Sequence, residues 1–403
     1  MSGNLSFLGI PAELRLVVYE LYLSEHQHVS NRRQPSNHHI RLLYICKQVF
    51  DEAVSIIGRY VSLQHERQIN AFILHATESQ AAQIHLADVA NDGRVSGPTN
   101  ASVDADQPLV PLSNLHLALR RMTSLTCLRV FQCRQGIPIN IQKINARLAI
   151  RFEHAMYPSG YPHHLTAYEL FLDPETRVTL FEVVLPQFIE VLRVTGECHL
   201  PAAVCMPALR HLMLYGITGN HFDQHTVEES LSGCRLHSFI YGLGHRLGFE
   251  IRNRHLESLA SVAGAHLRKL VLLGCSRLTS TVIAACLENM PKLEHFALSL
   301  VTVDELRTNF VLSLPPTISV FKLQLTNAWY AIPLLSDERG LCNALEDVLL
   351  RRPIAPQHVC VCLRNSLMIE GDRQDRWKEL ARNRCFQLDF GLWQGEDLED
   401  LPS

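Results

Sequence analysis

The 403-residue sequence contains no uninterrupted run of about 18 apolar residues, and its N-terminus lacks the basic start and long apolar core of a secretory signal peptide. The first absence argues against a membrane-spanning helix, and the second argues against secretion. We therefore expect no membrane partner and a cytoplasmic or nuclear location.

The sequence also lacks a strong excess of charge of either sign. It has 37 Lys and Arg residues against 40 Asp and Glu residues, which gives a formal net charge of −3. Nucleic-acid-binding proteins usually carry clustered positive charge, so nucleic acid is not an expected partner. Because 47% of the residues are apolar, an intrinsically disordered chain is excluded as well.

Motifs that bind metals or catalyse reactions are missing too. The twelve cysteines include no Cys-x-x-Cys pair, so we interpret them as reduced thiols, many of them buried. Five possible zinc ligands lie close together in the sequence: His26, His28, His38, His39 and Cys46. Their spacing differs from that of known zinc modules and favours an exposed loop. We expect no metal, no cofactor and no catalytic residue, and we predict that the protein is not an enzyme.

What the sequence does contain is a repeated apolar phrase. Residues 267–298 read LRKLVLLGCSRLTSTVIAACLENMPKLEHFAL, with an L-x-x-L-x-L type of pattern near both ends. Between the two copies, Ile283, Cys286, Leu287 and Met290 recur at helical spacing. A strand followed by a helix makes one unit of the leucine-rich-repeat pattern. Such a unit needs neighbours to cover its apolar face.

Further copies of this phrase occur along the chain. They begin at Leu125, Ala167, Ile189, Leu209, Leu236, Ile318 and Leu345. From Leu209 onward, and including those in residues 267–298, successive copies start 25 to 31 residues apart. This interval is close to the ~20–29 residues of a leucine-rich repeat, and the pattern predicts roughly eight to ten repeats. A weaker unit is expected at ARLAIRFEH, residues 146–154.

Composition divides the chain into four segments. Residues 88–112 combine Gly, Pro, Asn, Asp and Ser with few large apolar residues, which is typical of a linker. We expect a helical module at 1–65, a connecting segment with this linker at 66–112, the repeat array at 113–393 and an acidic tail at 394–403.

The N-terminal segment has helical periodicity. In GIPAELRLVVYELYL the proline stands where a first-turn proline is tolerated, and Leu14, Val17, Val18 and Leu21 share one face. In IRLLYICKQVFDEAVSIIGRY apolar residues again recur at helical spacing. The polar connector at residues 24–39 is expected to be an exposed loop. Two helices with so much apolar surface need a partner.

The phrases FLGIPAELRLVVYELYL and LLYICKQVFDEAVSIIGRY resemble the F-box-like N-terminus of fungal proteins, with its L-P-x-E-L-R start and its L-x-x-x-C-[KR]-Q-x-x-x-E-A phrase. The resemblance covers about residues 7 to 60, and that to leucine-rich repeats covers about residues 120 to 355. It implies an α/β fold in which an N-terminal F-box-like helical module is followed by a leucine-rich-repeat solenoid.

This resemblance also implies a function: a substrate-recognition subunit of an SCF-type cullin-RING ubiquitin ligase. The F-box would bind a Skp-family adaptor and, through it, the cullin complex, while the repeats would bind an unknown protein substrate. The residues that match the F-box pattern are Ile10, Pro11, Leu14, Val18, Leu21, Leu43 and Cys46. The alternative is a leucine-rich-repeat scaffold without ligase association, whose N-terminal helices only cap the array.

The residues between the leucines of each phrase point to the opposite, concave face of the array. The candidate substrate-binding residues at these positions are Arg129, Arg193, His211, Tyr215, Lys269, His295, Lys322 and Arg351. Arg and Lys pair well with carboxylate and phosphate groups, so one hypothesis is that this face binds an acidic or phosphorylated segment. The alternative is that these charges only solvate an exposed face.

Overall fold

The computed structural model describes residues 7–29, 35–97, 110–133, 147–160, 162–201, 204–243, 248–302, 306–328 and 335–393. The chain forms two compact units, the first made of residues 1–172 and 178–185 and the second of residues 173–177 and 186–403. It is a mixed α/β protein. Among the described residues, twelve strands belong to a parallel sheet, four of them in the first unit and eight in the second.

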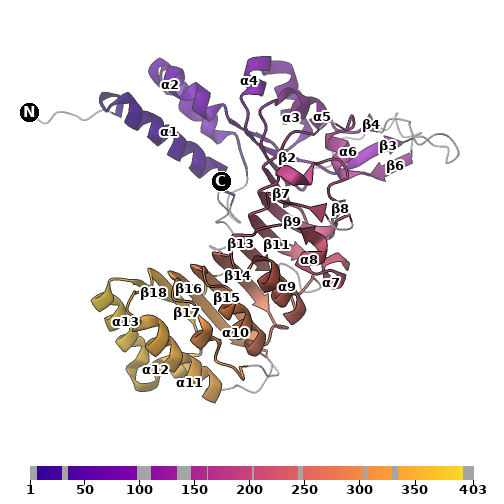
Figure 1. Ribbon diagram of the computed structural model, residues 1–403. Coiled ribbons are helices and arrows are strands. Elements are labelled where there is room, and N and C mark those ends of the chain that lie inside the picture. The colour runs from indigo at the N-terminus through magenta and orange to yellow at the C-terminus, as the bar shows by residue number, and fades with distance from the viewer. Residues whose placement is uncertain are drawn as a thin grey trace, which may run out of the picture. The chain divides into compact units, whose positions relative to one another are not determined.

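In the first unit, helices precede and connect the parallel strands. Its helices are η1 (Phe7–Gly9), α1 (Ala12–Gln27), η2 (His38–Tyr44), α2 (Lys47–Ile57), α3 (Glu66–His75), α4 (Glu78–Ala82), α5 (Leu115–Arg121) and α6 (Phe152–Met156). Its parallel strands, in spatial order, are β1 (Tyr60–Leu63), β2 (Leu86–Ala90), β5 (Cys127–Phe131) and β7 (Ala167–Phe171). Figure 1 shows α1 and α2 side by side. The sheet thus begins at Tyr60, earlier than the sequence pattern indicated.

The N-terminal helices are confirmed, but their connector is not simply an exposed loop. The second apolar segment divides into the 3-10 helix η2 and the α-helix α2. His39 in η2 is fully buried, and its Nε2 lies 3.2 Å from the carbonyl oxygen of Tyr60. Burial lowers the pKa of His39 to about 4, so its imidazole is neutral at pH 7. A neutral, hydrogen-bonded histidine can therefore serve as a core residue in a polar-looking segment.

The expected linker at residues 88–112 is partly β-structure. Asp88 is buried in β2, and a small antiparallel sheet with the order β4–β3–β6 combines β3 (Arg94–Gly97), β4 (Val110–Pro111) and β6 (Arg147–Ile150). Residues 98–109 lie outside the described residues. The prediction of a weak repeat unit at residues 146–154 was wrong. Its strand β6 pairs antiparallel with β3 and does not join the parallel sheet.

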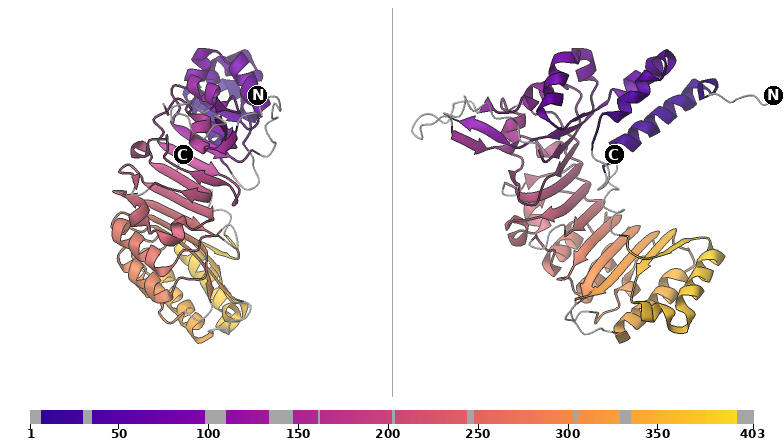
Figure 2. Two further views of the ribbon diagram at one scale, coloured as in Figure 1. Left: turned by 90° about the vertical axis from the view of Figure 1, so that its right-hand side faces the viewer. Right: turned by 180° about the vertical axis from the view of Figure 1, so that it is seen from behind.

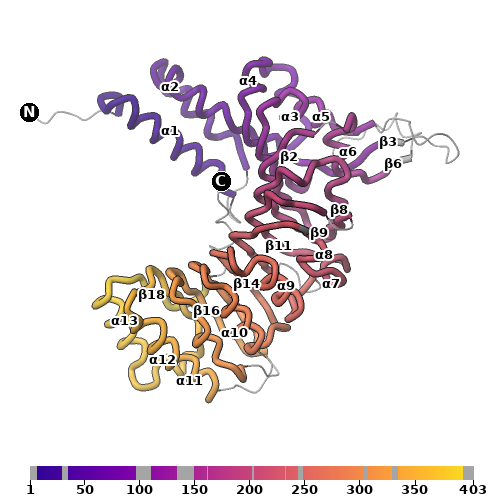
Figure 3. Tube along the Cα trace, viewed as in Figure 1, coloured from indigo at the N-terminus to yellow at the C-terminus, as the bar shows by residue number. Residues whose placement is uncertain are grey.

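Among the described residues of the second unit, eight parallel strands are neighbours in chain order. The course of the chain through them can be followed by its colour in Figure 3. These strands are β9 (Val191–His199), β11 (His211–Ile217), β13 (Ser238–Gly242), β14 (Lys269–Cys275), β15 (His295–Thr302), β16 (Val320–Asn327), β17 (His358–Cys362) and β18 (Gln387–Phe390). A separate parallel pair is made by β10 (Val204–Cys205) and β12 (Leu231–Ser232). The short strand β8 (Arg177–Thr179) falls where the chain passes between the two units in sequence.

Helices of the second unit lie along one face of these strands, as α9, α10 and α13 show in Figure 2. The helices are η4 (Pro186–Phe188), α7 (His221–Gln224), α8 (Val227–Ser230), α9 (Asn253–Ala263), α10 (Ser280–Glu288), η5 (Phe310–Ser313), α11 (Leu335–Ala344), η6 (Leu345–Leu350), α12 (Asn365–Ile369), η7 (Glu370–Asp372) and α13 (Arg373–Arg384). The leucines of the repeated phrase are buried, as are the four apolar residues predicted for the helix after residue 279. The strand–helix unit predicted at residues 267–298 is therefore confirmed.

One predicted strand was wrong. The phrase LEDVLL at residues 345–350 forms the π-helix η6, and the strand that follows β16 is instead β17. Arg351 therefore caps a helix, where its guanidinium lies 2.6 Å from Glu346, and is not on a strand. Leu345, Leu349 and Leu350 are buried at a spacing that suits a helix as well as a strand.

In the part of the chain that the structure describes, no helix has both the length and the apolar character needed to cross a membrane.

Candidate functional site

One face of α1 is both apolar and exposed. We call it the α1 stripe, and its members with their exposed fractions are Leu14 (56%), Val17 (52%), Val18 (42%) and Leu21 (66%). The helix begins directly after Pro11, whose φ of −53° already suits a helical start. The sequence periodicity predicted this face correctly, and the structure leaves it uncovered among the described residues.

The opposite face of α1 holds the helix in place. Tyr19 and Leu23 pack with Ala53 and other residues of α2 in one buried cluster. At its edge, the Arg15 guanidinium donates to both carboxylate oxygens of Glu52, at 2.9 and 2.5 Å, and the Tyr19 hydroxyl donates to the same carboxylate at 3.1 Å. The hydrogen bonds from Arg15 lower the pKa of Glu52 to about 2, so the pair is ionised at neutral pH.

The remaining residues predicted to bind an adaptor have different environments. Pro11 is exposed and Ile10 is half-buried at the start of α1. Leu43 and Cys46 are also half-buried, and they pack against the buried cluster of α1 and α2 rather than joining the α1 stripe. The prediction also left out exposed apolar residues that follow in the same module, namely Tyr44, Ile45 and Phe50.

A second candidate surface is the strand face of the second unit that does not contact the helices. Strand register defines two rows on it. The polar row consists of His211, Ser238, Lys269 and His295, and the apolar row consists of Met213, Ile240, Val271 and Ala297. Arg193 pairs in register with one end of the apolar row, and Lys322 pairs with the other end. The structure thus brings five predicted residues together here, and Tyr215 joins them because the Arg193 guanidinium lies 5.6 Å from its ring centroid.

Sequence reasoning missed the apolar row. Its members stand between the leucines of each phrase, so the sequence did contain the signal, but we selected only polar and charged side chains there. The row is buried, and Trp393, which follows β18, belongs to the same cluster and is only 4% exposed. Lys322 is also buried, with its Nζ 5.9 Å from the Trp393 ring centroid.

Gly391 lies between β18 and Trp393. Gly391 continues β18 by donating its N–H to the Val361 carbonyl oxygen at 3.1 Å. Its φ of +137° lies in a region that is essentially restricted to glycine, and the chain turns there. The predicted acidic tail at 394–403 lies outside the described residues.

Arg129 does not belong to this surface. It lies in the first unit, is 7% exposed, and donates to both carboxylate oxygens of Asp88 at 2.6 and 3.0 Å. It also donates to the carbonyl oxygen of Gln27 at the end of α1, at 2.6 Å, and the Tyr60 hydroxyl donates to Asp88. Arg129 thus ties α1 to the strands of the first unit, and its predicted contact with a substrate stays a prediction.

Three of the buried thiols have raised pKa values. Burial raises the pKa of Cys286 and of Cys342 to about 11, and it also raises the pKa of Cys275 well above its ordinary value. These groups are protonated at neutral pH, whereas a cysteine nucleophile needs its thiolate form. Within the described residues, no group of three or more His, Cys, Asp or Glu side chains is arranged to hold a metal ion.

The comparisons with known proteins add no identification to this geometry. No protein-family model matches the sequence, and no curated protein matches it significantly.

Proposed function

We propose that this protein is the substrate-recognition subunit of an SCF-type cullin-RING ubiquitin ligase, acting in the cytoplasm or nucleus and carrying out no catalysis itself. In this proposal the N-terminal F-box-like helices bind a Skp-family adaptor, and the parallel strands are leucine-rich repeats that hold a protein substrate. The observation that carries it is the exposed α1 stripe.

The α1 stripe supports the proposal because the fold itself does not use it. Four large aliphatic side chains on one helix face are exposed, while the other face of the same helix is fixed by Arg15 and Tyr19. Association that covers these side chains removes apolar surface from water, which is favourable, and a contiguous exposed stripe of this kind usually marks a binding surface. The stripe also coincides with residues that match the F-box pattern.

One observation favours the alternative, a repeat scaffold whose helices only cap the array. The buried cluster of α1 and α2 includes Tyr60 of β1, so these helices do cover the first strand. This capping uses the buried face of α1, however, and leaves the α1 stripe available for a partner. The two roles are compatible, and adaptor binding decides between a ligase subunit and a scaffold.

The second part of the proposal concerns the substrate. We assign substrate contacts to the strand face of the second unit, through the residues Arg193, His211, Tyr215, Lys269, His295 and Lys322. These residues border the buried apolar row, and the arginine, lysine and histidine side chains among them would complement an acidic segment. Arg129 and Arg351 lie outside this face.

The experiment is a pull-down of the purified full chain with a purified Skp-family adaptor. We compare the wild type with the double variant Leu14→Asp, Val18→Asp, and with the control Leu74→Asp, which changes a still more exposed leucine on α3. The wild type and the control should bind, whereas the double variant should not, because two carboxylates would be desolvated in the interface. Circular dichroism and the Tm check that all three are folded. A folded wild type that captures no adaptor would overturn the ligase proposal and leave the scaffold.

A further inference from the structure

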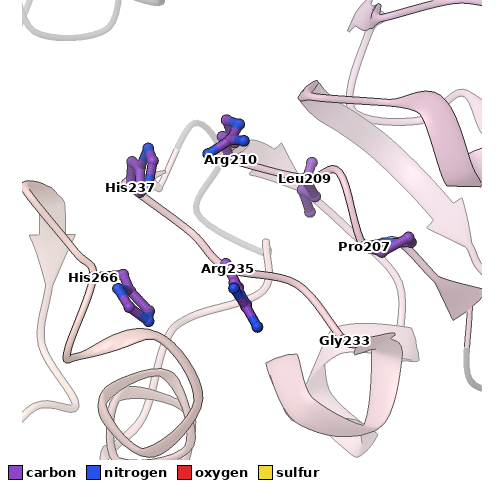
Figure 4. A pocket seen from close by; sticks show the side chains of 7 residues that line it. All are labelled: Pro207, Leu209, Arg210, Gly233, Arg235, His237 and His266. Carbon is purple, nitrogen blue, oxygen red and sulfur yellow. The ribbon is translucent and has the colours of Figure 1, made fainter.

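A cavity of about 380 Å³ lies in the second unit, near the points where parallel strands begin (Figure 4). Its lining residues are Pro207, Leu209, Arg210, Gly233, Arg235, His237 and His266. They come from the segments that precede β11, β13 and β14. The cavity is therefore built from three successive strand connections, and it is distinct from the polar and apolar rows.

The lining is basic. Two arginines and two histidines contribute to it, and none of the seven residues is acidic. Neither Arg210 nor Arg235 forms an ion pair with any residue that the structure describes, and both side chains are exposed. Other arginines of the same unit are paired, as Arg252 is with Asp223 at 3.1 Å and Arg268 is with Glu294 at 3.5 Å.

The positive charge at this cavity affects the pKa of His237. Burial lowers the pKa of His237, and the positive charges of Arg210 and Arg268 lower it further. His266 also lowers the pKa of His237. An anion in the cavity would face guanidinium and imidazole groups with no competing carboxylate among the lining residues.

We propose that this cavity binds the phosphate group of a phosphate monoester, with Arg210 and Arg235 as its main ligands. Guanidinium groups match phosphate oxygens in geometry and form charge-assisted hydrogen bonds with them. Gly233 has no side chain, so a ligand can approach the backbone closely there. The phosphate can come from a free small molecule or from a phosphorylated side chain of a protein. We assign it to the phosphorylated side chain of a captured substrate, and this assignment rests on the proposed function.

The site is tested by isothermal titration calorimetry of the full chain with inorganic phosphate at low ionic strength. The variant Arg210→Gln, Arg235→Gln should bind phosphate at least roughly tenfold more weakly, because two charge-assisted contacts are lost. Arg382→Gln removes an exposed arginine on α13, outside the cavity, and should change the affinity less than about twofold. Equal affinity of the double variant and the wild type, or no phosphate binding by the wild type, would overturn the site.

A second titration distinguishes the two sources of phosphate. The probe is the acetylated pentapeptide Gly-Ala-Ser-Ala-Gly with and without a phosphate on its serine. Tighter binding of the phosphopeptide than of inorganic phosphate supports a phosphorylated protein segment, whereas binding of inorganic phosphate alone would overturn that assignment. The cavity variant should still capture the Skp-family adaptor, and the Leu14→Asp, Val18→Asp variant should still bind phosphate. Failure of the phosphate site and failure of the adaptor proposal are thus distinguishable.

Discussion

Glu153 is a buried carboxyl group in the first unit whose partners are backbone amides. It is fully buried in α6, and its carboxylate accepts hydrogen bonds from the N–H groups of Phe181, Val183 and Val184 at 2.7–2.9 Å. These bonds hold the segment 181–184 against α6. Burial raises the pKa of Glu153 from 4.5 to about 7, and the three amides offset this increase only in part.

This raised pKa predicts a pH dependence of stability. Below pH 4.5 Glu153 is protonated in the folded and unfolded chain alike. As the pH rises from 4.5 to about 7, the unfolded chain releases the proton while the folded chain keeps it, so stability falls. The loss is at most about 3 kcal/mol and stays constant above that range.

Urea unfolding of the wild type and of Glu153→Gln at pH 5 and pH 8 measures this effect. Glutamine cannot titrate, so the loss between the two pH values should be smaller in the variant, by roughly 2 kcal/mol. Parallel profiles of the two proteins would show that Glu153 is already ionised in the fold at pH 5.

At the scale of single elements, two helix glycines should respond to alanine in opposite directions. A methyl group on Gly264, at the end of α9, would lie 2.4 Å from the Ala260 carbonyl oxygen and 2.6 Å from that of Asn289. A methyl group on Gly340, inside α11, would meet no atom within 4 Å. Neither residue has a positive φ, so the backbone conformation itself suits alanine at both sites.

We therefore expect Gly340→Ala to stabilise the protein by about 0.5–1 kcal/mol, since alanine restricts the unfolded chain without a clash in the fold. Gly264→Ala should destabilise it by about 1–3 kcal/mol, because backbone atoms cannot move aside cheaply. Thermal unfolding by differential scanning calorimetry measures both. Changes of the same sign would contradict the packing that the structure shows around α9.

The strand–helix units could be predicted from the sequence because their signal is local. Leu270 and Leu272 are buried on one face of β14, and Leu267 is buried just before the strand, as the spacing of the phrase requires. The predictions failed where the compensating partner is distant in sequence. In the sequence Asp88 resembles a linker residue, because its partner Arg129 is 41 residues away. The residues near Trp393 in the sequence likewise give no sign of the strands whose side chains share its cluster. The basic cavity is of the same kind, since its residues come from three separate connections.

At the scale of the whole second unit, the strands form a nearest-neighbour series, because each pairs with the strands before and after it along the sheet path. Stability in such a series is close to a sum of local terms, so its end should open first. Trp393 departs from this rule. It follows the last strand, yet it shares a buried cluster with Met213 of β11 and Ala297 of β15.

This departure should appear in amide hydrogen exchange. In the wild type, the amides of β17 and β18 should be protected to nearly the same degree as those of β14, because opening the end strand also breaks up the cluster. In Trp393→Ala the amides of β18 should exchange at least about tenfold faster, while those of β14 change little. Leu392→Ala, at a side chain that is 78% exposed, should leave both unchanged. Equal protection of β18 in the wild type and in Trp393→Ala would show that the tryptophan does not couple the strands.

If Trp393 couples the strands as its cluster predicts, the end of the second unit should not fray one strand at a time. We then expect a protease to cut β17 and β18 only when the strands that share the cluster open together, so this end should resist proteolysis about as well as β14 does.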